Sequence, residues 1–176
     1  MKRTLKAALT LASAAFAVQP IAASAQQQCL SEQEVSAMII YAVPHALRGL
    51  GTKCGPALAG DGFFKRGGAD LASRYAAQGN ANWPLAFDAF LKFAGVNGAM
   101  GESPMPLDQL PPEVVRPLVN ELVAQKVAQD LKVEDCRKYE RVLEVVAPLE
   151  PEELGAISAI VFSMVGVENP SVCAVE

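Results

Sequence analysis

Three side chains that could transfer a proton or bind an anion lie close together around the single histidine of the chain. Tyr41, His45 and Arg48 share one stripe of a predicted helix, opposite its apolar face, at about 100° per residue. An unperturbed histidine titrates near neutral pH, so a small enzyme could use His45 as an acid or a base. An ordinary solvent-exposed face, with cations where the helix dipole favours them, explains the same pattern. We favour the solvent-exposed face and keep the enzyme as an alternative.

The cysteines argue against thiol or metal chemistry beside this histidine. An even number of cysteines in an exported chain is typical of disulfides, and the chain has no CxxC pair of the kind that binds zinc. We therefore predict two disulfides among the four cysteines, which are Cys29, Cys54, Cys136 and Cys173. Cys54 would then be unavailable as a nucleophile beside His45. The sequence predicts neither a metal nor a cofactor.

A second candidate site is Phe63-Phe64-Lys65-Arg66, in a predicted loop bounded by glycines. The glycine-rich stretches of the chain do not form a GxGxxG after a strand, so they do not indicate nucleotide binding. Two aromatic side chains beside two cations could instead dock an amphiphile with an anionic head group. Eight of the ten aromatic residues after position 25 lie within 41–93, where they form either the core or an apolar ligand pocket. We expect at least one of the two phenylalanines in the core.

The first 25 residues have the pattern of a signal peptide. Lys2, Arg3 and Lys6 precede an apolar run, and an Ala-Ser-Ala sequence ends at Ala25, where we predict cleavage. The apolar run is shorter than the roughly 20 residues that a transmembrane helix needs, so we expect no membrane span after cleavage. Residues 26–176 then form one predicted domain, which is periplasmic or secreted.

The charge of the chain makes nucleic acid an unexpected partner. Cleavage would remove three of the 15 Lys and Arg residues and leave 12 against 19 Asp and Glu, a net charge of −7. The acids concentrate in the second half, where residues 101–176 carry six bases and 14 acids. A protein with this balance and no basic stripe is a poor binder of nucleic acid phosphates.

Apolar residues recur with the period of a helix, and no stretch alternates apolar and polar residues as a strand does. This pattern predicts an all-α fold, a compact bundle of five to six helices stapled by the two disulfides. The first predicted helix starts at a capping box, Ser31 to Glu34, and ends at Gly49 and Gly51. A second, shorter helix covers 69–78, and Asn82 caps a third.

A long Gly- and Pro-rich connection at 95–112 separates these helices from three more. The fourth predicted helix runs to about Leu131, the fifth to Ala147, and acids from Glu150 onward open the sixth. The sixth helix is apolar around much of its circumference, and its remaining side consists of Gly155, Ala159 and Ser163. We therefore expect the sixth helix to be central and closely packed.

The length of the first helix restricts the disulfide pairing. It would separate its ends by about 27 Å, whereas a disulfide needs Cα atoms about 5.5 Å apart. A Cys29–Cys54 bond is therefore disfavoured, and with it Cys136–Cys173. Two pairings remain: Cys29–Cys173 with Cys54–Cys136, and Cys29–Cys136 with Cys54–Cys173. We favour the first because the termini of a domain are often close together.

These patterns predict a location and an architecture more than a reaction. We expect an exported binding or interaction protein of the bacterial cell envelope, whose partner is an envelope protein or an amphiphilic ligand. One alternative is a carrier of an apolar or amphiphilic ligand, which would use the aromatic-rich half at 41–93. The other is the small enzyme centred on His45.

Overall fold

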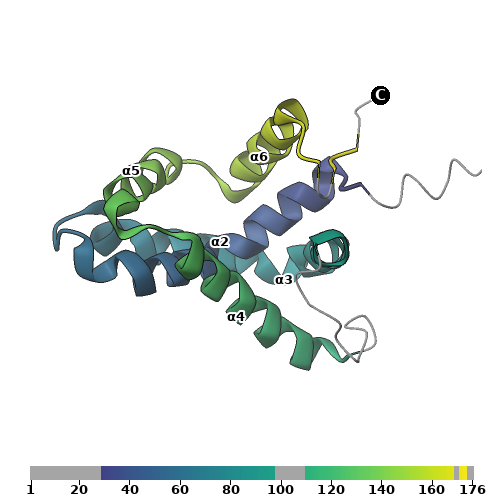
Figure 1. The fold of residues 1–176 in the computed structure, drawn as a ribbon, viewed down its shortest axis with the longest axis horizontal. Helices are drawn as coiled ribbons and strands as arrows, with labels where there is room; N and C mark the ends of the chain where they lie inside the picture. Colours follow the sequence, from purple (N-terminus) through teal and green to yellow (C-terminus); the bar gives the residue numbers. More distant parts are fainter. Residues whose placement is uncertain (1–28, 98–109, 169–170, 174–176) are drawn as a thin grey trace, which may run out of the picture.

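The structure is a computed structural model that describes residues 29–97, 110–168 and 171–173. Within these ranges the chain forms five α-helices and no strand beyond isolated β-bridges, which confirms the all-α bundle (Figure 1). No helix in the described ranges is long and apolar enough to span a membrane. The predicted signal peptide and most of the connection at 95–112 lie outside the described residues, so both stay predictions.

The helices follow one another in a simple order. They are α2 (Glu32–Cys54), α3 (Phe63–Asn97), α4 (Pro112–Asp130), α5 (Cys136–Val146) and α6 (Pro151–Val165). Two short 3₁₀-helices, η1 (Gly55–Ala57) and η3 (Val133–Asp135), precede α3 and α5. Helix α2 occupies the centre and packs against α3, α4 and α6, which lie around it (Figure 1).

Helix α2 begins at the predicted capping box. The Ser31 hydroxyl accepts a hydrogen bond from the Glu34 N–H at 3.2 Å, and Glu34 Oε2 accepts one from the Ser31 N–H at 2.8 Å. The prediction that α2 ends at Gly49 and Gly51 is wrong, because both glycines serve packing. A Cβ at Gly49 would overlap the Ala124 carbonyl oxygen of α4, and one at Gly51 would lie 3.0 Å from the Phe64 ring. The missing side chains let α4 and α3 approach, and the helix continues to Cys54.

The helix predicted at 69–78 and the one predicted after Asn82 are a single helix of 35 residues, α3. Asn82 does not cap a helix, because its side-chain amide donates to the Gln78 carbonyl one turn earlier, at 3.1 Å. Gly79 does not end one either, although a glycine costs about 1 kcal/mol in a helix interior. Burial on both sides of these positions outweighs such local costs. The buried apolar residues of α3 are Leu71, Tyr75, Trp83, Ala86 and Ala89.

Helix α6 packs closely on α2, but it is not central. Its predicted acidic start is present, and the Glu150 N–H donates to Glu153 Oε2 at 2.9 Å. The small side of the helix faces α2: Gly155 and Ala159 are buried, and a Cβ at Gly155 would overlap the Ser36 side chain. The expectation of a central α6 is wrong because only this small side and the flanking Leu154 and Phe162 are covered.

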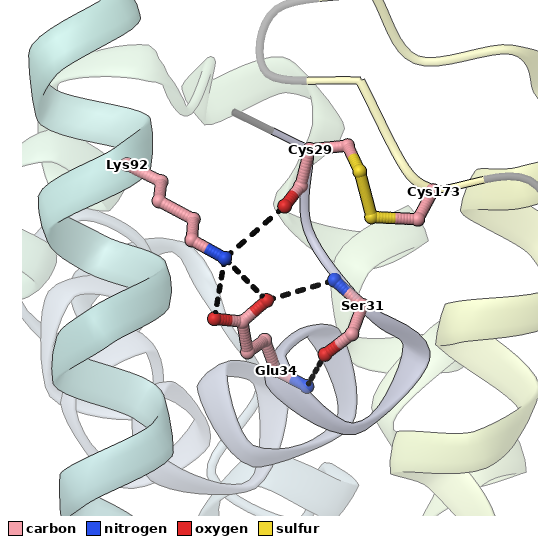
Figure 2. A network of polar contacts seen from close by, with 5 residues as sticks. All are labelled: Cys29, Ser31, Glu34, Lys92 and Cys173. Atoms are coloured by element: carbon pink, nitrogen blue, oxygen red, sulfur yellow. Dashed lines mark hydrogen bonds and ion pairs between the residues drawn. A yellow bond between two sulfur atoms is a disulfide. The ribbon is translucent and has the colours of Figure 1, made fainter. Parts of the chain in front are cut away.

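The two disulfides join Cys29 to Cys173 and Cys54 to Cys136, with Cα atoms 5.1 and 5.5 Å apart, which confirms the favoured pairing. The first joins the start of α2 to the C-terminal segment (Figure 2). The Leu30 N–H donates to the Ser171 carbonyl of this segment at 2.8 Å. The second joins the end of α2 to the start of α5. Two disulfides are typical of proteins outside the cytoplasm.

Candidate functional site

Tyr41, the first member of the predicted polar stripe, is buried. Its hydroxyl donates to Asn120 Oδ1 on α4 at 2.6 Å, and its ring centroid lies 4.9 Å from that of Trp83 on α3. Only 9% of Tyr41 is exposed. The interpretation of this stripe as an ordinary solvent-exposed face is therefore wrong at Tyr41, because α3 and α4 cover that side of α2.

His45 and Arg48 both lie near Asn120 of α4, but His45 lines a cleft whereas Arg48 lies at the surface. His45 is half-buried at a cleft of about 190 Å³ between α2, α3 and α4, with its ring centroid 5.3 Å from that of Tyr41. Arg48 lies at the surface, where it donates to the Asn120 carbonyl and forms an ion pair with Glu121, each at 2.9 Å. The structure thus brings His45 and Tyr41 together and directs Arg48 to α4.

The cleft at His45 holds an imidazole without a nucleophile. Burial lowers the pKa of His45 below its usual value, and the charge of Arg48 lowers it further. Burial also raises the pKa of Tyr41, so that hydroxyl stays protonated near neutral pH. No Ser, Cys, Asp or Glu lines the cleft, whose other residues are Pro44, Ala76, Gly79, Asn80, Arg116 and Asn120. The pairing of base and nucleophile that covalent catalysis needs is therefore not assembled by these lining residues.

The remaining polar groups of this cleft are better suited to packing than to chemistry. The Arg116 guanidinium lies 4.9 Å above the Trp83 ring and donates to Asn80 Oδ1 at 2.8 Å, while its buried Nε has no partner among the described residues. All four cysteines form disulfides. In the part of the chain that the structure describes, no group of His, Cys, Asp or Glu side chains is placed to hold a metal ion.

The second candidate site, Phe63 to Arg66, lies in the first turn of α3 and not in a loop. Both phenylalanines are half-buried and pack against the core cluster around Tyr75, while Lys65 and Arg66 are exposed. The start of the helix is capped from α5, because the Phe64 N–H donates to Glu140 Oε1 at 2.9 Å. This capping carboxylate lies 76 residues away in sequence, and for that reason the helix start could not be predicted locally.

Arg66 shares a cleft of about 430 Å³ with two arginines of α5, Arg137 and Arg141. Within the described residues, none of the three guanidinium groups makes an ion pair or a hydrogen bond. The cleft is also lined by Gly62, Phe63, Glu140, Glu144 and Val145. The two α5 arginines were not among the predicted site residues. Their i,i+4 spacing, which places them on one face of a helix, is the signal that could have found them.

The other aromatic residues of the first half mostly fill the core. Tyr75 is fully buried and Trp83 is 6% exposed. Phe87 stacks on Trp83 with ring centroids 5.0 Å apart, and Phe90 packs against the same cluster. Little of this aromatic surface is therefore left to line a ligand pocket.

The large apolar side of α6 faces away from the bundle. Five residues form this outer face, with exposed fractions from 44% to 80%; they are Ile157, Ile160, Val161, Met164 and Val165. A single exposed apolar side chain is ordinary, but several on one short helix form a continuous patch. The apolar circumference of this helix predicts a central position, and its exposed outer face contradicts that expectation.

A groove of about 400 Å³ lies beside the outer face of α6, between α6, α2 and α3. Its apolar lining comes from all three helices and includes Ile40, Leu85 and Ala159. Two acids, Glu32 and Glu152, also line it. Ile160 belongs to the groove and to the outer face, so the two form one continuous apolar surface.

Comparisons with known proteins find no match for this chain, whether with protein-family models, with curated proteins or with solved structures. Its function therefore has to be inferred from its own geometry. Three features are available for that inference: the cleft at His45, the arginine-lined cleft between α3 and α5, and the outer face of α6 with its groove.

Proposed function

We propose that the protein is an exported interaction protein of the bacterial cell envelope, and that the outer face of α6 docks a partner protein. One observation carries the proposal: five large apolar side chains are exposed on one side of a 15-residue helix. Burying apolar surface is favourable by roughly 25 cal/mol per Å². A partner that covers this face would gain that free energy, which the isolated fold leaves unused.

The packing of α6 against the rest of the fold suits this helix to docking a partner. Its small side lies close against α2 through Gly155 and Ala159, so the helix is held in place by the central helix of the bundle. The Cys29–Cys173 disulfide ties the segment that follows α6 to the start of α2. A surface that is already ordered loses little conformational entropy on binding, which favours affinity.

Export is supported by the two disulfides and by the pattern of the first 25 residues. The periplasm or the extracellular space would allow these bonds to form and persist. N-terminal sequencing of the protein recovered from the cell envelope or the medium should give Gln26 as its first residue. Recovery of the chain with Met1 from those compartments would contradict cleavage after Ala25.

Native mass spectrometry of the protein purified from its own cell envelope tests the docking role. The wild type should carry a second protein in a fixed ratio. A Val161→Asp/Met164→Asp variant should lose that protein, because charges on the outer face of α6 oppose its burial. The matched control is Gln125→Asp/Gln129→Asp, which adds the same charge at exposed positions of α4 and should keep the partner. A wild type without a bound protein, or loss of the partner from both variants, would contradict the proposal.

A second candidate function is the binding of an anionic amphiphile in the cleft between α3 and α5. Three arginines without partners among the described residues line that cleft beside Phe63 and Val145. Guanidinium groups suit phosphate or carboxylate head groups, and the two apolar side chains suit the start of an acyl chain. The amphiphile was proposed from the sequence to bind at Phe63 to Arg66, and the proposed site is now the cleft between α3 and α5. Phe64 is not part of this site, because it packs on α2 and away from the cleft lining.

Binding of lysophosphatidylglycerol below its micelle concentration tests the second candidate. The wild type should bind this lipid more tightly than it binds inorganic phosphate, and an Arg137→Gln/Arg141→Gln variant should bind it more weakly. Lys126→Gln/Lys132→Gln, which removes the same charge outside the cleft, is the control. Equal weakening by both variants would indicate a general charge effect and would contradict a site at this cleft.

A further inference from the structure

We infer that the groove and the outer face of α6 bind a basic amphipathic helix of a partner protein. The inference rests on the proposed function and adds the chemistry of the partner. It is carried by three features of the docking surface: its charge, the absence of compensating cations, and the spacing of its apolar side chains.

The charged residues that line the groove, and those of α6 itself, are all acidic. Residues 142–176 contain six glutamates and no lysine or arginine. Glu32 and Glu152 line the groove, and both are exposed. Glu153 is exposed as well and lies on the same helical stripe as Ile157 and Ile160, four and seven residues before them. An apolar surface with acids at one end is complementary to a partner that is apolar and positively charged.

Among the described residues, the cations of the neighbouring helix α3 form no ion pair with these acids. Lys92 is bonded to Glu34 and to the Cys29 carbonyl. Arg74 donates to the Ala147 carbonyl, in the turn before α6. Glu152 accepts a hydrogen bond at 2.7 Å from Gln78, which is a neutral residue. Among the described residues, Glu32, Glu152 and Glu153 therefore have no cationic partner, and a basic ligand would supply one.

The spacing of the apolar side chains favours a helical partner. Ile157, Ile160 or Val161, and Met164 repeat at the intervals with which one helix presents a stripe to another. Helix α6 has 15 residues, so the stripe is about 22 Å long and matches four turns of a second helix. The groove beside it has room for apolar side chains of that second helix. This is the helix-in-groove arrangement by which many amphipathic segments are recognised.

The same charges disfavour the two other occupants of such a surface. An anionic membrane would be repelled by glutamates at the edge of the patch, since cations are what attract proteins to anionic lipids. A second copy of this chain, related by a twofold axis, would use the same patch on both sides of the interface. Residues 142–176 of that copy contain no lysine or arginine that could pair with Glu152 and Glu153, so the acids would gain no complementary charge.

Fluorescence anisotropy with synthetic peptides tests this inference on the exported protein. The probes are two labelled helical peptides of about 18 residues, with leucines at identical positions and either lysine or glutamate elsewhere. The lysine peptide should bind at least about tenfold more tightly than the glutamate peptide, and added salt should reduce the difference. Ile160→Ser/Val161→Ser should weaken the binding of the lysine peptide, because this variant removes apolar surface and leaves the acids in place.

A variant with three charges removed separates the docking surface from the net charge of the protein. Glu32→Gln/Glu152→Gln/Glu153→Gln should lose about tenfold in affinity for the lysine peptide. Glutamine at position 153 can still accept the capping hydrogen bond of α6. The matched control, Glu113→Gln/Glu134→Gln/Glu144→Gln, removes three exposed acids that do not line the groove and should change the affinity much less.

The outcomes distinguish this inference from the proposed function. If both peptides bind equally and the serine variant abolishes their binding, the inference of a basic partner is overturned, but α6 is still a docking face. Equal effects of the two glutamine variants would also overturn it, because binding would then follow net charge alone. Binding to phosphatidylglycerol vesicles, or self-association in sedimentation that the serine variant abolishes, would replace the partner helix by a membrane or a second copy. Failure of both peptides, together with no α6-dependent partner from the envelope, would overturn both proposals.

Discussion

The ammonium of Lys92 on α3 lies 2.7 and 2.8 Å from the two carboxylate oxygens of Glu34 on α2 (Figure 2). The same ammonium donates to the Cys29 carbonyl at 3.2 Å, beside the disulfide to Cys173. Glu34 also completes the capping box with Ser31. One lysine therefore couples the start of the central helix, helix α3 and the disulfide-linked C-terminal segment.

Replacing Lys92 should lower the stability of the protein. Glu34 is only 8% exposed, so Lys92→Met would leave a buried carboxylate without its cation. We expect the free energy of unfolding in urea to fall by about 2 to 4 kcal/mol. Lys138→Met is the control, because its ion pair with Asp135 is at the surface and should contribute much less to stability. Similar losses in the two variants would show that the buried pair has no special role.

The stability lost in the Lys92→Met variant should depend on pH in a definite direction. Burial raises the pKa of Glu34, but hydrogen bonds from Lys92 and Ser31 and the Lys92 charge outweigh it and leave this pKa below 4.5. A lowered pKa means that Glu34 contributes stability above about pH 4.5, which is lost as the pH falls through its folded-state pKa. The difference between the wild type and Lys92→Met should therefore shrink in acid. A constant difference would contradict the coupling.

Gly49→Ala should destabilise the protein even though alanine is the better helix former. Its Cβ would overlap the backbone carbonyl of Ala124, which cannot rotate away, so α2 and α4 would have to separate. We expect a loss of about 1 to 3 kcal/mol in urea unfolding, in spite of a gain of about 1 kcal/mol in helix propensity. Gly55→Ala has open space around the new Cβ and should be neutral or slightly stabilising. A stable Gly49→Ala variant would show that the helices are not in such close contact.

Substitutions of Phe63 and Phe64 should distinguish an effect on stability from an effect on ligand binding. Both are half-buried, so alanine at either position should cost roughly 1.5 to 3 kcal/mol, less than the 3 to 5 kcal/mol of a fully buried ring. Only Phe63 lines the arginine cleft. Phe63→Ala should therefore also weaken lysophosphatidylglycerol binding, whereas Phe64→Ala should not. Thermal melts with and without this lipid measure both effects, and equal lipid shifts in the two variants would count against the cleft.

His45 should titrate below the usual value for a histidine. Burial disfavours the imidazolium form, and the charge of Arg48 acts in the same direction. His45 is the only histidine, so its ring proton gives an unambiguous NMR signal, whose midpoint should lie below pH 6.5. Because this pKa is lowered, protonation of the unfolded chain should reduce stability as the pH falls below about 6.5, and His45→Gln should lack that decrease. A midpoint at or above 6.5 would contradict the burial of the ring beside the Arg48 charge.

Signals that act within one turn or follow from chain length could be predicted from the sequence. The capping box at Ser31 and Glu34 is such a signal, and so is the acidic start of α6. The length of α2 also disfavoured a Cys29–Cys54 bond, and the usual proximity of domain termini favoured the pairing that the structure shows over the one that remained. These features depend on residues that are near neighbours or on distances that a helix makes definite.

Features that depend on a distant partner could not be predicted. Gly49 and Gly51 read as helix ends because nothing near them in sequence shows that Ala124 and Phe64 press against them. The start of α3 depends on Glu140 of α5. The orientation of α6 is a third case, because periodicity shows an apolar circumference without showing which part is covered. The small side faces α2 because it allows the closest approach, and the five large side chains of the opposite face are exposed.

The most direct test of the docking role is site-specific photo-crosslinking in living cells. A photoreactive residue at Val161, on the outer face of α6, should form one discrete adduct with another protein of the cell envelope. The same residue at Gln129, which is exposed on α4, should form none. The adduct at Val161 should disappear when Ile157→Asp is added, while the disulfides and the thermal melt stay unchanged. No adduct at Val161, or equal adducts at Val161 and Gln129, would contradict the account.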